Sequence, residues 1–230
     1  MNNQNEITKL KLVNKIKEEG NAVTFQFEKK DLNWTPGQYE VYTLPSAGDK
    51  TEDNKRYFTI SSAPSERTVN ITTRITDTKF KQALNNLEIG DEIERSDIDG
   101  DFIWEDDIPE EKIFVAAGIG ITPFRSILVE RKNTGKKLNV KLLYFNRTSE
   151  IIFQDELKEL SKDHPEFQVE FIVGERVSAE SILSRIPDTN NKMIYLTGPE
   201  PMVESVGEAL KQKGIKIKQD WFPGYDEKNF

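Results

Sequence analysis

The sequence predicts two domains, an antiparallel β-barrel or β-sandwich followed by a doubly wound α/β domain. In the first hundred residues, apolar and polar side chains alternate with the period of two that is typical of strands. After Pro109, short apolar runs alternate with stretches of helical periodicity. An acidic segment, Glu105 to Glu111, separates the two regions, and a length of 230 residues accommodates two modest domains. We therefore place the domain boundary in this acidic segment.

The first region is expected to form short antiparallel strands separated by turns. The expected strands are Leu10–Ile16, Ala22–Phe27, Tyr39–Leu44, Arg56–Ser61, Thr68–Ile75 and Glu92–Ser96. Strands of this length and spacing are typical of barrels and sandwiches. One helix is expected at Lys79–Leu87, because apolar residues recur there at i, i+3, i+4 and i+7.

The second region alternates strands with helices, which predicts a parallel sheet covered on both faces. The expected strands are Ile113–Ala117, Val140–Phe145, Gln168–Val173 and Met193–Leu196. The expected helices are Pro123–Arg131, Phe153–Leu160, Ala179–Ile186 and Met202–Lys213. The aromatic-rich tail, residues 218–225, is expected to end in a strand docked on this sheet.

The composition excludes several classes of protein. The absence of cysteine excludes disulfides, thiolate-held iron–sulfur clusters and a cysteine nucleophile, and with one histidine, His164, we expect no metal site. The net charge is −8, and residues 1–107 hold 14 Lys and Arg against 21 Asp and Glu, which argues against nucleic-acid binding. No apolar run is long enough for a membrane span and the N-terminus does not resemble a signal peptide, so we expect a cytoplasmic protein.

A glycine turn follows the first strand of the α/β region. Gly118 and Gly120 let the backbone turn sharply and approach a ligand, and Thr122 with Pro123 predicts a helix start in which the threonine hydroxyl caps a free N–H. A strand, a glycine turn and a helix N-terminus together form a phosphate cradle. Taken alone, the same residues are also compatible with an ordinary tight turn.

A second candidate motif lies on a strand of the first region, at Arg56-Tyr57-Phe58-Thr59. A guanidinium suits a pyrophosphate and an aromatic ring suits a flat heterocycle. Because side chains two apart share a face of a strand, Arg56 and Phe58 are expected on one face and Tyr57 and Thr59 on the other. The alternative is a barrel strand with an exposed arginine and core aromatics.

Five segments in order resemble the ferredoxin–NADP reductase superfamily, in its short form without a fused iron–sulfur domain. They are Pro36-Gly37-Gln38, Arg56-Tyr57-Phe58-Thr59, Gly100-Asp101-Phe102, Gly118-Ile119-Gly120-Ile121-Thr122-Pro123, and Gly198-Pro199 with Met202. The resemblance implies a six-stranded FAD-binding β-barrel at residues 1–107 and an NAD(P)-binding α/β domain at residues 108–230. It also implies hydride transfer from NADPH or NADH to FAD, followed by electron delivery to a separate acceptor such as ferredoxin or flavodoxin.

The resemblance assigns roles to individual residues. Thr59, near the flavin N5 atom, and Thr197, near the nicotinamide, are the predicted catalytic residues. The predicted cofactor-binding residues are Arg56, Tyr57, Phe58, Thr59, Thr73, Arg74, Phe80, Lys81, Gly118, Gly120, Thr122, Arg147, Arg176, Gly198, Pro199, Phe222 and Tyr225. Among them, Arg56 is expected to neutralise the FAD pyrophosphate, Phe58 to pack on the isoalloxazine ring, and Phe222 or Tyr225 to cover the ring face until nicotinamide displaces it.

The chain departs from the family pattern at three places. Phe58 replaces the usual tyrosine, and Thr197 replaces a cysteine, so catalysis cannot depend on a thiol. Thr78-Lys79-Phe80-Lys81 replaces the second phosphate motif, where Thr78 is expected to cap the helix instead. Arg147 and Arg176 at strand ends favour NADPH over NADH.

The electron acceptor is left open by the sequence. An acidic ferredoxin would be repelled by the acidic barrel unless residues such as Lys79, Lys81 and Arg95 form a local basic patch. The alternatives are a reductase of small acceptors, such as free flavin or quinone, and a non-catalytic docking subunit that retains the fold.

Overall fold

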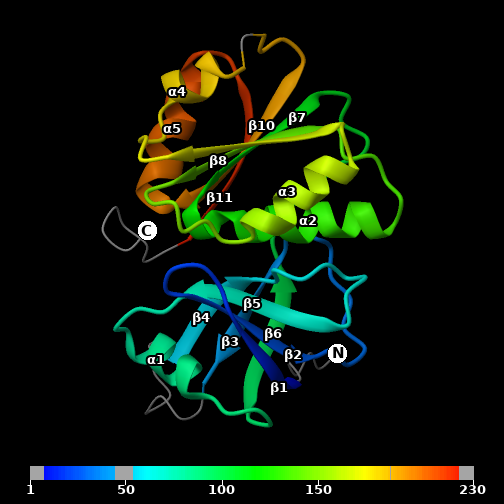
Figure 1. Cartoon of the computed structure of the whole chain (residues 1–230), viewed down its shortest axis with the longest axis vertical. Helices are drawn as coiled ribbons and strands as arrows, with labels where there is room; N and C mark the ends of the chain where they lie inside the picture. Colours follow the sequence, from blue (N-terminus) through cyan, green and yellow to red (C-terminus); the bar gives the residue numbers. More distant parts are fainter. Residues whose placement is uncertain (1–7, 45–53, 187, 223–230) are drawn as a thin grey trace, which may run out of the picture.

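A six-stranded antiparallel sheet forms the N-terminal part of the protein. The structure, a computed structural model, describes residues 8–44, 54–186 and 188–222. The strands are β1 (Thr8–Lys17), β2 (Ala22–Glu28), β3 (Tyr39–Thr43), β4 (Lys55–Thr59), β5 (Thr68–Arg74) and β6 (Glu92–Asp99), in the order β4-β3-β6-β1-β2-β5. Beyond the end of β4, Ser61 N donates a 2.9 Å hydrogen bond to Asn70 O of β5. The sheet thus curls until its two edges meet, which makes it a barrel rather than a sandwich (Figure 1).

Alternating side chains of these strands fill the barrel. Phe25 and Phe27 of β2 and Ile71 of β5 are fully buried, as period-two alternation requires. Helix α1 (Lys79–Asn86) contributes Phe80 and Leu84 to the same core. Its N-cap is Thr78, whose hydroxyl accepts from Lys81 N, so the predicted cap is confirmed.

The C-terminal part is a parallel sheet of β7 (Glu111–Ala117), β8 (Val140–Asn146), β9 (Phe167–Val173), β10 (Lys192–Pro199) and β11 (Lys216–Phe222). The strand order is β11-β10-β7-β8-β9, so the chain winds outward in both directions from β7. The helices are α2 (Thr122–Asn133), α3 (Gln154–Asp163), α4 (Ala179–Ser184) and α5 (Glu200–Gln212). The predicted doubly wound architecture is confirmed, and the aromatic tail does contribute a strand, β11.

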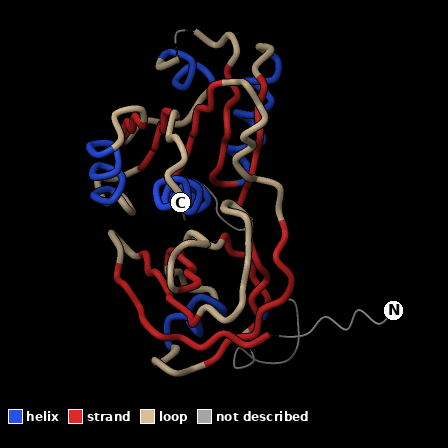
Figure 2. Tube along the Cα trace, turned by 90° about the vertical axis from the view of Figure 1, so that its right-hand side faces the viewer, coloured by secondary structure: helices blue, strands red, loops and turns tan. Residues whose placement is uncertain are grey.

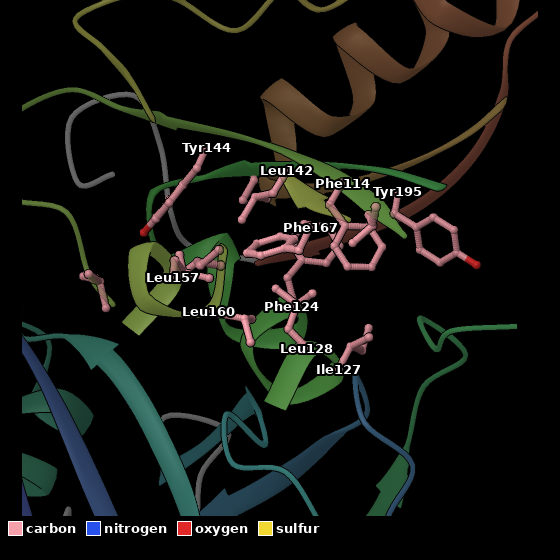
Figure 3. Packing of buried hydrophobic residues seen from close by; sticks show 14 of the residues in the cluster. Phe114, Phe124, Ile127, Leu128, Leu142, Tyr144, Leu157, Leu160, Phe167 and Tyr195 are labelled. Carbon is pink, nitrogen blue, oxygen red and sulfur yellow. The ribbon is translucent and has the colours of Figure 1, made fainter. Parts of the chain in front are cut away.

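Each face of the parallel sheet packs on its own pair of helices. Phe114, Leu142 and Tyr195 face α2 and α3, and Figure 3 shows them meeting Phe124 and Leu157 in one cluster. The residues between them in the strands pack on α4 and α5 instead. Strands buried on both faces explain why these segments are nearly continuous apolar runs.

Helix α2 lies between the parallel sheet and the barrel in both views (Figures 1 and 2). Ser126 Oγ of this helix donates a 2.7 Å hydrogen bond to Ser62 O in the loop after β4. The segment between β6 and β7 connects the two parts, and the exact division at residue 107 stays a prediction. Within the described ranges, every helix is too short or too polar to cross a membrane.

Candidate functional site

The glycine turn after β7 is a single 3-10 turn, Gly118–Ile121, that runs directly into α2. Gly118 has φ +52°, a conformation that glycine adopts at little cost. The predicted hydroxyl cap at Thr122 is wrong, because Thr122 is already the first helical residue. Its hydroxyl donates a 3.1 Å hydrogen bond back to Ile119 O. The N-cap is Ile121, whose side chain forms no capping hydrogen bond.

The turn packs directly against the end of β10. A β-carbon on Gly120 would lie 2.8 Å from Thr197 O and 2.9 Å from Gly198 Cα, and one on Gly198 would lie 3.0 Å from Ala117 Cβ. Only glycine fits such contacts. The two predicted nucleotide motifs are therefore brought together at the carboxyl ends of β7 and β10, the edge where ligands bind in sheets of this kind.

Thr197 lies at this junction and is fully buried. Among the described residues, its Oγ1 has no hydrogen-bond partner. A buried hydroxyl without a partner costs about 1–3 kcal/mol, so a ligand group that pairs with it is favoured. The residue type and position fit a nicotinamide at this place.

A cleft of about 600 Å³ lies between the barrel and the parallel sheet. It is lined by Gly37, Tyr39, Tyr57, Thr59, Asp99, Gly100, Asp101, Phe102, Gln219, Asp220, Trp221 and Phe222. Because β11 pairs with β10, Trp221 lies opposite Gly198 and Phe222 opposite Pro199. The cleft therefore adjoins the glycine end of β10 and also contains the predicted residues Tyr57, Thr59 and Phe222.

Aromatic side chains line this cleft from both domains. Tyr57 is 59% exposed and packs edge-on against Tyr39, with ring centroids 5.7 Å apart. Trp221 is 47% exposed. A flat heterocycle is the kind of ligand that such surfaces bind. Tyr225, predicted to cover the flavin, lies outside the described residues.

Asp220 is an acid in the cleft that the sequence did not single out. It is half-buried, and the partial loss of contact with water raises the pKa of its carboxyl to about 6, with the nearby Asp101 acting in the same direction. Trp221 N donates 3.1 Å to Asp220 Oδ1, which opposes the shift. The position follows from the pairing of β11 with β10, and no local sequence signal indicates it.

Phe58 lies on the opposite face of β4, as strand alternation predicted. It is buried in the barrel core, where its ring centroid is 5.8 Å from Phe80 and 6.1 Å from Tyr42. The core position agrees with the alternative considered above, and the aromatic residue of β4 that lines the cleft is Tyr57. The flavin-packing role of Phe58 stays a prediction.

Three cations gather near the N-terminus of α1. The Arg56 guanidinium lies 5.7 Å from the centre of the Phe80 ring. Burial, together with the charges of Arg56 and Arg74, lowers the pKa of Lys81 to about 8. Arg74 follows Thr73 at the end of β5, and its buried Nε has no partner among the described residues. Crowded cations beside a helix N-terminus fit a pyrophosphate group.

Arg147 and Arg176 are exposed and follow neighbouring strands of the sheet. A hydrogen bond joins the ends of β8 and β9: Gly174 N donates to Asn146 O at 2.9 Å. Glu175, the acid at this edge, pairs with Arg185 at 2.8 Å. The two predicted arginines thus share the carboxyl edge of the sheet with the glycine turn.

The basic patch that an acidic ferredoxin would require on the barrel is not formed by Lys79, Lys81 and Arg95 together. Arg95 pairs at 2.5 Å with Glu40, a carboxylate buried in the barrel, and Lys81 is itself buried. Of the three, only Lys79 is exposed. The sequence could not reveal this, because Glu40 and Arg95 meet only through the pairing of β3 with β6.

Comparisons with known proteins identify the class of the C-terminal part. Residues 114–208 match the model of the oxidoreductase NAD-binding domain. The chain is 30% identical over 226 residues to the flavohemoprotein of Candida albicans, covering 89% of this chain and 56% of that protein. It is 29% identical over 229 residues to the reductase subunit of stachydrine N-demethylase from Rhizobium meliloti, covering 91% and 64%. The chain thus spans little more than half the length of these relatives.

Solved structures with the same fold extend over both domains. The FAD/NAD-binding domain of nitric oxide dioxygenase from Vibrio cholerae has a TM-score of 0.78 at 22% identity, covering 93% of this chain and 98% of that one. A ferredoxin–NADP+ reductase from Neisseria gonorrhoeae with bound FAD and NADP has a TM-score of 0.79 at 18% identity, covering 94% and 98%. The C-terminal part thus matches an oxidoreductase NAD-binding domain, and the whole chain has the two-domain fold of ferredoxin–NADP+ reductase-like FAD/NAD-binding oxidoreductases.

Proposed function

We propose that this protein is a flavin-dependent oxidoreductase that oxidises NADPH or NADH and passes the electrons to a separate acceptor. The observation that carries the proposal is the packing of Gly120 against Gly198 beside a cleft lined by Thr59, Tyr57 and Trp221. This arrangement supports a nucleotide site in one domain that faces a heterocycle site in the other. The FAD and NADP bound to the structural relative from Neisseria gonorrhoeae support the same cofactors here.

The residues of this chain would act by binding and orientation. Arg56, Arg74 and Lys81 would hold the FAD pyrophosphate, and Gly118, Gly120 and Thr122 that of the nucleotide. Thr59 and Thr197 would offer hydroxyl groups on the two sides of the reacting rings. When bound, the flavin supplies an acceptor that takes two electrons and releases them singly or in pairs. Orientation of two bound reactants contributes a large part of such a rate.

NADPH is the proposed physiological nucleotide. Arg147 and Arg176 are exposed at the edge where the 2′-phosphate of the nucleotide would lie, and Glu175, the acid that could bind a ribose diol there, is engaged by Arg185. Arg147→Ala and Arg176→Ala are expected to raise KM for NADPH and leave KM for NADH unchanged. Equal effects on both nucleotides would contradict a 2′-phosphate contact.

The acceptor is proposed to be a separate electron carrier. The relatives named as the reductase subunit of a demethylase and as the reductase subunit or component of two monooxygenases support this reading. Steady-state rates with ferredoxin and flavodoxin, compared with free flavin and quinone, distinguish it from a reductase of small acceptors. A higher kcat/KM for the small molecules would reverse the assignment.

The visible spectrum of the purified protein tests the proposal most directly. A flavin band is expected, and anaerobic NADPH is expected to bleach it faster than NADH does. Gly120→Ala provides the comparison, because it fills the nucleotide junction and leaves the flavin residues intact. A preparation that stays colourless with added FAD would favour the docking subunit, and a bound flavin that neither nucleotide bleaches would refute the enzyme.

A further inference from the structure

Arg125 of α2 uses every hydrogen-bond donor of its guanidinium. Nε and Nη2 donate to the two carboxylate oxygens of Glu156, at 2.8 and 2.9 Å. Nη2 and Nη1 donate to the two oxygens of Glu66, at 3.1 and 3.0 Å, and Nη1 also donates 2.8 Å to Ser61 O. A guanidinium has five N–H donors in a rigid fork, so its position is fully determined.

These acceptors come from both domains. Glu66 and Ser61 lie in the barrel loop between β4 and β5, and Glu156 lies in the first turn of α3. The Arg125 side chain is 12% exposed and stacks 5.1 Å from the centre of the Phe153 ring. Bidentate pairs of this kind are directional as well as strong. Arg125 thus joins three elements in one fixed arrangement.

The loop 61–66 is also held by neighbouring residues of α2. Ser126 Oγ donates 2.7 Å to Ser62 O, and Glu130 Oε2 accepts 2.8 Å from Ser65 N. Both partners of this contact are close along the chain to residues of the candidate site. Ser61 follows Thr59 by two residues, and Arg125 follows Thr122 by three. Any shift of Arg125 against the loop therefore moves one half of the site relative to the other.

We propose that Arg125 is a positioning residue that sets the placement of the Thr59 strand end relative to the Gly118–Ile121 turn. The inference rests on the proposed function, in which a hydride, two electrons with one proton, passes from the reduced nicotinamide to the bound flavin. Arg125 acts through Ser61, Glu66 and Glu156 and is not placed among the cofactor contacts. A misplacement of about 1 Å between bound reactants costs about a hundredfold in rate.

The first test compares Arg125→Gln and Arg125→Lys with Glu130→Gln. Gln keeps one or two donors and Lys cannot form the fork, whereas Glu130→Gln retains an oxygen that accepts from Ser65 N. Arg125→Gln is expected to slow anaerobic bleaching of the flavin by NADPH about tenfold to a hundredfold. KM for NADPH and the flavin content are expected to stay within about twofold. Glu130→Gln is expected to bleach at the wild-type rate.

The second test is chemical rescue. Arg125 borders a cleft of about 730 Å³ between the domains, which lets solutes reach Glu66 and Glu156. Millimolar guanidinium, far below denaturing concentrations, is expected to restore the bleaching rate of Arg125→Ala. Tetramethylammonium at equal ionic strength is expected to leave it slow, because it has no N–H donors. The melting temperature and flavin spectrum of each variant show whether it remains folded and loaded.

The outcomes separate the two proposals. If a nucleotide bleaches the wild-type protein and the Arg125→Gln variant equally fast, the positioning role is overturned and the proposed function stands. A slow variant that has lost its flavin or its fold, and that guanidinium does not rescue, also overturns it. Wild-type protein that neither nucleotide bleaches refutes the proposed function, and the positioning role falls with it.

Discussion

Gly120 and Gly198 approach each other so closely that a β-carbon on Gly120 would lie 2.9 Å from Gly198 N. The atoms that this β-carbon would meet belong to the backbone, so they cannot move aside as a flexible side chain could. Gly120→Ala is expected to lower the free energy of unfolding by about 1–3 kcal/mol, the usual cost of an overfilled site. It is also expected to raise the Kd for NADPH at least tenfold, measured by calorimetry.

The control for this glycine is Gly135→Ala. Gly135 has φ +69° and no atom within 4 Å of an added β-carbon. The variant is expected to lose about 1 kcal/mol through backbone strain and to bind NADPH unchanged. Unaltered NADPH binding in Gly120→Ala would contradict the assignment of this turn.

Neighbouring aromatic residues of β4 are expected to respond in opposite ways. Phe58 is buried with Phe80 and Tyr42, so Phe58→Ala is expected to cost about 3–5 kcal/mol of unfolding free energy. Tyr57 is 59% exposed in the cleft, so Tyr57→Ala is expected to change stability by less than about 0.5 kcal/mol. It is expected to weaken FAD binding about threefold to tenfold through lost stacking. Urea unfolding and flavin fluorescence titration measure the two effects, and a fully stable Phe58→Ala would show that the ring is not part of the core.

Lys81 is expected to make flavin binding depend on pH. Its pKa of about 8 means that it is charged at pH 7 and mostly neutral at pH 9, before an anion binds. A bound pyrophosphate favours the charged form, so FAD affinity is expected to fall about tenfold between pH 7 and pH 9. Lys81→Met is expected to bind FAD weakly at both pH values.

Lys79→Met is the matched control for Lys81, because Lys79 is exposed on the same helix. Its FAD affinity is expected to follow the wild-type pH profile. If the FAD affinity of Lys81→Met shows the wild-type dependence on pH, a group other than Lys81 is responsible for it.

Ionised Asp220 is expected to lower the free energy of unfolding above pH 6. Its pKa is raised from 3.8 to about 6 by burial, so the unfolded chain releases the proton first as pH rises. The free energy of unfolding is therefore expected to fall between pH 4 and pH 6 and to stay lower above. Asp220→Asn is expected to be about 1–2 kcal/mol more stable than wild type at pH 7.5 and equal to it at pH 4, by urea titration.

The control for Asp220 is Asp163→Asn, at an exposed carboxyl near the end of α3. It is expected to change stability by less than about 0.5 kcal/mol at either pH. A gain at pH 4 as large as that at pH 7.5 would show that ionisation of Asp220 is not the cause of the effect.

The order of strands and helices could be predicted from the sequence because periodicity is a local property. The alternation of Val23, Phe25 and Phe27 with polar residues marks a strand whichever partner it finds. The pattern alone could not distinguish a barrel from a sandwich. That depends on Ser61 meeting Asn70, a contact between edge strands of the same sheet.

The sequence by itself determined the two-domain architecture, the glycine turn and the facing of Tyr57 away from Phe58, since each depends on residues that are close along the chain. The tertiary structure decided which charges are free. It joined Arg95 to Glu40, Arg185 to Glu175, and Arg125 to Glu66 and Glu156. It also placed Asp220, half-buried, at the edge of the cleft. The physical reason is that an ionisable side chain takes its charge and orientation from partners distant in sequence, whereas strand and helix formation follow from the local spacing of apolar residues.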